Sequence, residues 1–196
     1  MNRCSWVNPK NPLYLSYHDE EWGRPVHEDQ ALFELLCLET YQAGLSWETV
    51  LTKRAAFRAA FFDYQVERVA RMTDEELDGL LINPSLIRHK AKLYATRTNA
   101  QAFLSVVAAY GTFDRYLWSW VEGQVIDVPV ASFRDLPSQT ELSARLAKDL
   151  KQRGFRFVGP VCVYSYLQAA GLFHTHEVTC FVRKEKKEVK DERVFE

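Results

Sequence analysis

The sequence predicts an all-α domain with no substantial sheet, and three observations support that prediction. Apolar residues recur at helical spacing, as Leu32, Leu35 and Leu36 do early in the chain. Helix-start signals precede such stretches, for example the capping-box pair Thr73 and Glu76. Near the C-terminus, a short segment with glycine at both ends joins two further helical stretches.

Each predicted helix has a recognisable start or stop. We expect helices over residues 29–43, 46–62, 73–82, 85–110, 113–121, 142–153 and 160–170. Ser46 and Ser85 can each begin a helix, and Gly111 can close the long helix that Ser85 opens. The segment 125–130 has extended character, but prolines in and after it limit strand formation.

Length and composition favour one soluble domain. With 196 residues, 47% of them hydrophobic, the chain can bury one sizeable core, so we expect a domain over 1–182 and a charged, solvated tail over 183–196. The net charge of −1 provides no global positive field, so any contact with DNA must be local. No apolar run approaches the roughly 20 residues that span a bilayer, and the first residues lack the apolar core of a signal peptide. We therefore expect a cytoplasmic protein with reduced thiols.

The four cysteines fall into two groups. Cys37 and Cys162 lie in apolar surroundings and are expected to be small buried hydrophobic residues. Cys4 and Cys180 lie in polar terminal segments, where burial in a core does not explain them. In a reducing compartment, metal binding or reactivity is the remaining role for such thiols.

Two histidines complete a candidate zinc site with the terminal cysteines. The proposed ligands are Cys4, His18, His176 and Cys180. His176 and Cys180 are four residues apart, so on a helix or turn they face the same way. A Cys₂His₂ set makes a closed, structural, tetrahedral site that would join the two ends of the chain. His27 and His174 remain rival ligands at this stage, and a set of fewer than four protein ligands would instead indicate a catalytic zinc hydrolase.

The glycine-bounded segment between the last two helices is a candidate DNA-binding hairpin. Backbone N–H groups at the start of the second helix, together with the helix dipole, suit a phosphate oxygen. The candidate DNA contacts are Lys151, Arg153, Gly154, Phe155, Val158 and Gly159, with Lys148 and Arg156 adding positive charge nearby. The alternative is an ordinary hairpin between helices with a solvated basic face. A second basic cluster, over residues 88–92, is by itself typical of an ordinary surface.

Glu39 continues the buried stripe of the first predicted helix. It follows Leu32 by seven residues, Leu35 by four and Leu36 by three. A buried carboxylate needs a hydrogen-bond or charge partner, which can be a helix terminus or an arginine. The other interpretation is a pocket that recognises a polar or cationic ligand.

Aromatic residues surround Glu39 in the sequence. They are Trp6, Tyr14, Tyr17 and Trp22 before it, and Tyr41 and Trp47 after it. Aromatic faces with one acceptor suit an extruded nucleobase, and a cationic ring gains further from such faces. The alternative is that these aromatic side chains belong to the core.

Several blocks of sequence carry a resemblance to a known family. They are residues 3–6 (RCSW), 17–23 (YHDEEWG), 38–47 (LETYQAGLSW), 87–90 (IRHK), 151–159 (KQRGFRFVG), 164–165 (YS) and 168–172 (QAAGL). In this order they resemble the signature blocks of the DNA-3-methyladenine glycosylase I family, and the resemblance runs from residue 1 to about residue 181. The chain departs from the family pattern in two places: at Pro84-Ser85, before the fourth block, and at Thr175.

The resemblance implies an all-α helix-hairpin-helix glycosylase with its N- and C-terminal regions clamped by zinc. It implies that Cys4, His18, His176 and Cys180 are the ligands of one structural Zn²⁺, which selects His176 over His174. It places Glu39 as the carboxylate that reads the base and is the catalytic residue, Tyr17 as a hydrogen-bonding neighbour and Trp47 as a stacking wall. Trp6, Tyr14 and Trp22 fall near the same pocket.

The implied activity is hydrolysis of the N-glycosidic bond of 3-methyladenine in alkylated double-stranded DNA. Residues 160–176 contain no Asp, Glu or Lys, which argues against a Schiff-base lyase and leaves water as the nucleophile. We expect Glu39 to stay ionised, the released base to be the product, and the protein to be a monomer. The rival functions are a non-catalytic binder of alkylated DNA, a zinc hydrolase unrelated to DNA and a helical interaction module.

Overall fold

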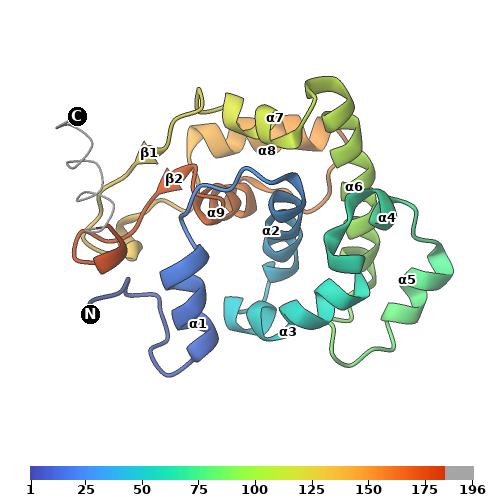
Figure 1. The fold of residues 1–196 in the computed structure, drawn as a ribbon, viewed down its shortest axis with the longest axis horizontal. Helices are drawn as coiled ribbons and strands as arrows, with labels where there is room; N and C mark the ends of the chain where they lie inside the picture. Colours follow the sequence, from blue (N-terminus) through green and yellow to red (C-terminus); the bar gives the residue numbers. More distant parts are fainter. Residues whose placement is uncertain (184–196) are drawn as a thin grey trace.

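The computed structural model describes residues 1–183, and this part of the chain is mostly helical. The elements in chain order are α1 (Pro12–Ser16), a π-helical turn (Tyr17–Glu21), α2 (Asp29–Gln42), α3 (Trp47–Ala60), a 3₁₀ turn (Phe62–Tyr64), α4 (Val66–Ala70), α5 (Asp74–Leu80), α6 (Lys90–Tyr110), α7 (Phe113–Ser119), β1 (Ile126–Asp127), a 3₁₀ turn (Phe133–Asp135), α8 (Glu141–Gln152), α9 (Pro160–Ala169) and β2 (Phe173–His174). The N-terminus and the end of the described chain lie on the same side of the molecule (Figure 1). The predicted all-α class is confirmed.

Helix α2 runs through the middle of the molecule (Figure 1). Every residue from Leu32 to Tyr41 is buried, and such a helix belongs in a core rather than on a surface. The Glu28 side chain caps its start, and the Asp29 carboxylate accepts N–H groups from the first turn of α7. Because α2 also packs against α3, α6 and α9, its position fixes the surrounding helices.

The predicted helix starts and stops are largely confirmed. Ser46 caps α3, Thr73 and Glu76 form a reciprocal capping box on α5, and Gly111 ends α6 at a φ of 89°. The predicted start of the long helix at Ser85 is wrong, because α6 begins at Lys90 with His89 as its cap. The side chain of Asn83 accepts the N–H of Ser85, so these residues form a turn before the helix.

The C-terminal half contains the predicted helix, hairpin and helix. Helix α8 ends at Gln152, and Gly154 follows in a left-handed conformation with a φ of 97°. Pro160 occupies the first turn of α9, where its missing N–H is tolerated. Helix α9 then packs against α8 on one side and α2 on the other.

A small parallel sheet completes the fold. Strand β1, in the segment predicted to be extended, pairs with β2, which aligns Ile126 with Phe173. An isolated bridge between Val130 and Glu177 continues this pairing. The pairing brings the C-terminal segment beside the loop that leads to α8.

Two expectations about burial need correction. Arg183 lies in the segment expected to be a solvated tail, but its guanidinium is buried and bonded to the carbonyl oxygens of His176, His174 and Val128. The remainder of the predicted tail, 184–196, lies outside the described residues. Cys37 is fully buried as expected, whereas Cys162 is only partly buried.

Candidate active site and metal centre

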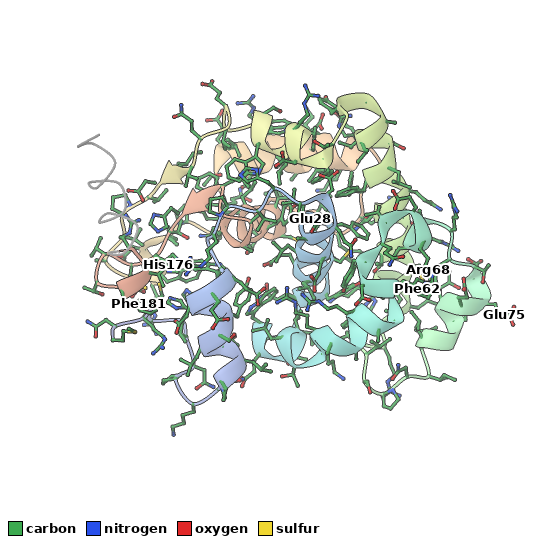
Figure 2. All side chains as sticks on the ribbon, viewed as in Figure 1. Glu28, Phe62, Arg68, Glu75, His176 and Phe181 are labelled. Carbon is green, nitrogen blue, oxygen red and sulfur yellow. The ribbon has the colours of Figure 1, made fainter. Side chains whose placement is uncertain are left out.

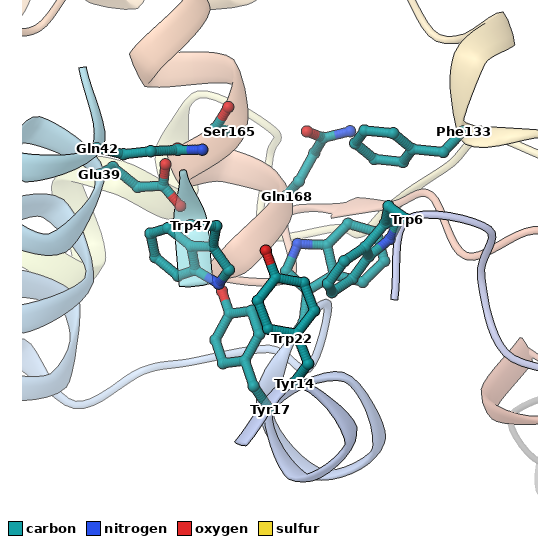
Figure 3. A pocket seen from close by; sticks show the side chains of 10 residues that line it. All are labelled: Trp6, Tyr14, Tyr17, Trp22, Glu39, Gln42, Trp47, Phe133, Ser165 and Gln168. Atoms are coloured by element: carbon teal, nitrogen blue, oxygen red, sulfur yellow. The ribbon is translucent and has the colours of Figure 1, made fainter. Parts of the chain in front are cut away.

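A cavity of about 250 Å³ lies where α1, α2, α3, α9 and the N-terminal segment meet. Its lining residues are Trp6, Tyr14, Tyr17, Trp22, Glu39, Gln42, Trp47, Phe133, Ser165 and Gln168. In Figure 3, Glu39, Gln42 and Trp47 lie on one side of the cavity, and Trp6 and Phe133 lie on the other. All six candidate residues for base binding and catalysis from the sequence therefore line one cavity.

The Glu39 carboxyl group is buried and faces this cavity (Figure 3). None of the hydrogen bonds or ion pairs among residues 1–183 involves its oxygen atoms, so neither a helix terminus nor an arginine explains its burial. Desolvation raises the pKa of Glu39 to about 8. With this pKa the carboxyl is mostly protonated at neutral pH, so the expected ionised form requires a positively charged or hydrogen-bonding group beside it.

Besides the Glu39 carboxyl, the aromatic walls of the cavity contain two indole N–H groups that can donate hydrogen bonds. The ring centroids of Tyr17 and Trp47 are 5.3 Å apart, and those of Trp6 and Trp22 are 5.0 Å apart. The indole Nε1 atoms of Trp6 and Trp47 are buried and have no hydrogen-bond partner within residues 1–183. Since buried donors are normally satisfied, these two N–H groups and Glu39 together indicate a site that awaits a ligand.

An ion-pair network connects the three elements that supply Tyr17, Glu39 and Trp47. Arg54, on α3, bonds Glu34 of α2 through Nε at 2.8 Å and Glu21 of the π-helical turn through Nη1 at 2.7 Å. Because Glu34 is almost fully buried, removal of its partners would leave an uncompensated charge. The network therefore fixes three walls of the cavity relative to one another.

The four candidate metal ligands meet in a buried cluster. The donor atoms of Cys4, His18, His176 and Cys180 all lie within 4.8 Å of one another. The Nδ1 atom of His176 is 3.4 Å from the Cys4 sulfur and 3.6 Å from the Cys180 sulfur. Tetrahedral zinc with bonds of about 2.3 Å to sulfur and 2.0–2.1 Å to nitrogen separates S from N by about 3.5 Å. The residues present therefore fit a Cys₂His₂ metal site.

The opposite ring nitrogens of both histidines have their own partners. His18 Nδ1 is 2.8 Å from the Asp19 carboxylate, which Arg3 also binds, and His176 Nε2 is 3.1 Å from the carbonyl oxygen of Trp22. Such outer partners fix the tautomer and the ring orientation of metal-binding histidines. The rivals lie elsewhere: His174 pairs with Asp127, and His27 lies on the surface beside Asp114.

The structure narrows the set of predicted DNA contacts on the hairpin. The N–H groups of Gly154 and Phe155 bond carbonyl oxygens of α8, and the Phe155 and Val158 side chains are buried. The Arg153 guanidinium binds Asp149 and also reaches the hydroxyl group of Tyr110. These internal bonds argue against direct contacts with DNA from Arg153, Gly154 and Phe155.

Groups that can still face a phosphate lie between the hairpin and α9. Lys151 and Lys148 are exposed beside a shallow groove at the start of α9, and Arg156 is exposed within the hairpin. Asn99 of α6 is fully buried; it accepts the N–H of Arg156 at 2.7 Å and donates to its carbonyl oxygen at 3.2 Å. The hairpin backbone is thereby fixed to the long helix.

Four cavity residues were not among the sequence candidates. They are Gln42, Phe133, Ser165 and Gln168. Gln168 is a buried polar residue on the apolar helix α9, so the reasoning that selected Glu39 would also have selected Gln168. Phe133 lies in a 3₁₀ turn outside any periodic pattern, and nothing in the sequence pointed to it.

Two curated proteins that are similar to this chain are named as DNA-3-methyladenine glycosylases. The DNA-3-methyladenine glycosylase of Haemophilus influenzae is 43% identical over 178 residues, which cover 91% of this chain and 96% of the relative. DNA-3-methyladenine glycosylase 1 of Escherichia coli is 42% identical over 180 residues, which cover 92% of this chain and 96% of the relative.

The fold agrees with a solved structure in which the ligand is a methylated base. A Tyr-to-Phe mutant of 3-methyladenine DNA glycosylase I, crystallised with 3-methyladenine, is similar with a TM-score of 0.89 and 43% identity, covering 93% of this chain and 97% of the other. Residues 6–184 also match the family described as methyladenine glycosylase. The chain thus belongs to the methyladenine glycosylase family.

Proposed function

We propose that this protein excises 3-methyladenine from alkylated DNA, with the flipped base bound in the cavity and read by Glu39. The observation that supports this most directly is a buried carboxyl without an internal partner, surrounded by aromatic faces. Such a site suits a flat, positively charged ring, since both the carboxylate and the π-faces attract a cation. The relatives named as 3-methyladenine glycosylases support the choice of base.

The charge of the substrate accounts for the unusual carboxyl. An adenine methylated at N3 within DNA carries a positive charge, which weakens its glycosidic bond. When this cation enters the cavity it favours the ionised form of Glu39, so binding releases a proton at pH values below about 8. The carboxylate then accepts hydrogen bonds from the polar edge of the adenine. Trp47 stacks on the ring, and Tyr17 borders the carboxyl.

Water is the proposed nucleophile, and the enzyme is monofunctional. No Asp, Glu or Lys lies in residues 160–176. The buried Lys92 does not line the cavity, and its Nζ donates to the carbonyl oxygens of Tyr41 and Ala43. Catalysis then depends on extrusion of the base, its recognition and stabilisation of the charge that develops as the bond breaks.

The metal is proposed to be one structural Zn²⁺ per chain. Cys4, His18, His176 and Cys180 would complete its tetrahedron, which leaves no open position for a water molecule or a substrate. This metal would supply folding free energy rather than chemistry.

No helix within residues 1–183 has both the length and the apolar character needed to cross a membrane. We infer a monomer that acts in the cytoplasm.

Contacts with double-stranded DNA are assigned to the start of α9 and the groove beside it. The Val158 and Gly159 N–H groups lead into the helix, where a phosphate oxygen is favoured by the dipole. Lys151 and Lys148 add positive charge at the same place, in a protein whose net charge is −1.

The experiment that tests this function measures the bases released from methylated DNA. We expect the wild-type protein to release 3-methyladenine, and Glu39→Gln to reduce kcat/KM about 10²-fold, as for loss of one preorganised electrostatic contact. Glu75→Gln, an exposed glutamate on α5 far from the cavity (Figure 2), is the matched control. Full excision by Glu39→Gln would refute the role of Glu39, and binding without release would indicate a non-catalytic DNA binder.

A further inference from the structure

Phe133 lies at the end of the cavity away from Glu39 (Figure 3). It belongs to the 3₁₀ turn between β1 and α8, which is otherwise part of an irregular segment. Its ring centroid is 6.3 Å from that of Trp6 and 6.1 Å from that of Trp22. Phe133 thus extends the aromatic wall formed by the N-terminal segment.

A buried glutamate holds this turn in place. Oxygen Oε1 of Glu177 accepts the N–H of Phe133 at 2.8 Å and the N–H of Ser5 at 3.0 Å. The same oxygen accepts the Ser5 hydroxyl group. Since Ser5 precedes Trp6, one carboxylate oxygen fixes two aromatic side chains of the cavity wall. The Glu177 backbone also pairs with Val130, which anchors the turn a second time.

We propose that Phe133 is a specificity-determining residue that limits the size of the alkyl group on the base, and that Glu177 is its positioning residue. This inference rests on the proposed function, in which Glu39 reads the polar edge of the adenine. It assigns a role to a residue that no sequence pattern selected.

The geometry of adenine connects Glu39 to Phe133. The exocyclic amine and N3 lie at opposite corners of the six-membered ring. A base whose amine donates to Glu39 therefore directs its N3 substituent away from Glu39, toward the end of the cavity that Phe133 closes. In the proposed arrangement this end accommodates the methyl group, and each further methylene would approach the Phe133 ring. In a packed apolar pocket, one methylene changes affinity by about 10–200-fold.

The test compares the binding of free 3-methyladenine, 3-ethyladenine and 3-propyladenine by titration calorimetry. For the wild-type protein we expect affinity to fall with each added methylene. For Phe133→Ala we expect the ratio of methyl to propyl affinity to fall by about tenfold or more. Phe62→Ala is the control, because Phe62 is also partly buried but lies on Arg68, far from the cavity (Figure 2). An unchanged ratio in Phe133→Ala would overturn the proposal.

Variants of Glu177 test the positioning role. Glu177→Gln keeps an acceptor oxygen and should keep the wild-type ratio, whereas Glu177→Ala should reproduce the weaker selectivity of Phe133→Ala. The metal content of each variant is measured in parallel. Loss of metal from Glu177→Ala, or loss of selectivity in Glu177→Gln, would overturn this role. If the wild-type protein bound none of the three bases, the proposed function itself would fail.

Discussion

The candidate metal cluster and the aromatic cavity are neighbours that differ in whether their polar groups have partners. The ring centroids of Trp22, in the cavity wall, and His176, in the cluster, are only 4.7 Å apart. In the cluster, the outer nitrogens of both histidines already have partners. In the cavity, Glu39 and two indole N–H groups have none within the described part of the chain. The cavity therefore presents polar groups that a bound molecule can satisfy, whereas the outer nitrogens of the cluster are already satisfied within the fold.

Removal of the metal should produce the largest loss of stability. Structural zinc contributes about 10–16 kcal/mol in isolated zinc-finger peptides, and this chain has a core of its own, so we expect a loss of about 5 kcal/mol. For a protein of this size that lowers Tm by roughly 10–20 °C, measured by calorimetry before and after chelation. An unchanged melting curve in a verified metal-free sample would contradict the structural role.

Glu39→Gln in the cavity should increase stability, whereas removal of the metal should lower it. Because the pKa of Glu39 is about 8 in the folded protein against 4.5 for the free group, folding opposes its ionisation. The free energy of unfolding therefore falls as pH rises from 4.5 to 8. At about pH 9, Glu39→Gln should be more stable than the wild type by up to about 5 kcal/mol, and near pH 4 the difference should vanish. Denaturation by urea across this pH range measures it, and equal stability at all pH values would contradict the burial of an unpartnered carboxyl.

Alanine variants of two tryptophans distinguish the role of the cavity from that of the candidate metal cluster. Trp47→Ala should weaken binding of 3-methyladenine about 10–100-fold with little change in Tm, as expected for loss of one stacking face. Trp22→Ala should weaken binding and also lower Tm, because Trp22 contacts His176. Trp120→Ala is the control for binding, because Trp120 caps the C-terminal end of α7 and is not one of the residues that line the cavity. If both cavity variants behaved alike in calorimetry and binding, the division between the two regions would not hold.

The smallest predicted effect lies outside both regions. Lys151→Ala should weaken binding to DNA and reduce the slope of log K against log salt by about one unit. Binding of free 3-methyladenine and Tm should stay at wild-type values, because Lys151 lies on the surface groove by α9. Glu122→Ala, which changes an exposed charge elsewhere, serves as the comparison. A salt slope equal to that of the wild type would remove Lys151 from the DNA contacts.

Local signals in the sequence predicted most helix ends correctly. Ser46, Thr73 and Gly111 act within a few residues of the ends that they define, so no tertiary information is needed. The expected start at Ser85 is wrong because the Asn83 side chain accepts the N–H of Ser85 in a turn, while the His89 side chain accepts the N–H of Lys92 and caps α6 there. The short elements α1 and α4 were not predicted, because five residues are too few to show a period.

The sequence predicted those site residues whose side-chain chemistry is unusual for their position in a helix. Glu39 stood out as a carboxylate on an apolar helix. Phe133 is not unusual for its sequence surroundings, and its turn is bonded to Glu177, which is 44 residues away in the sequence. The candidate metal ligands Cys4 and His176 are 172 residues apart, so their association depends on the whole fold. Spacing left His27 and His174 as rivals, and the resemblance to a family selected His176.

The central claim, that Glu39 is an unpartnered acid awaiting a cationic base, can be tested by NMR titration of its carboxyl carbon. The titration is performed with and without 3,9-dimethyladeninium, a permanently cationic analogue of the methylated base in DNA. The account predicts a pKa of about 8 in the free protein and a clear decrease when the cation is bound. A free value near 4.5, or a value that the bound cation leaves unchanged, would contradict it.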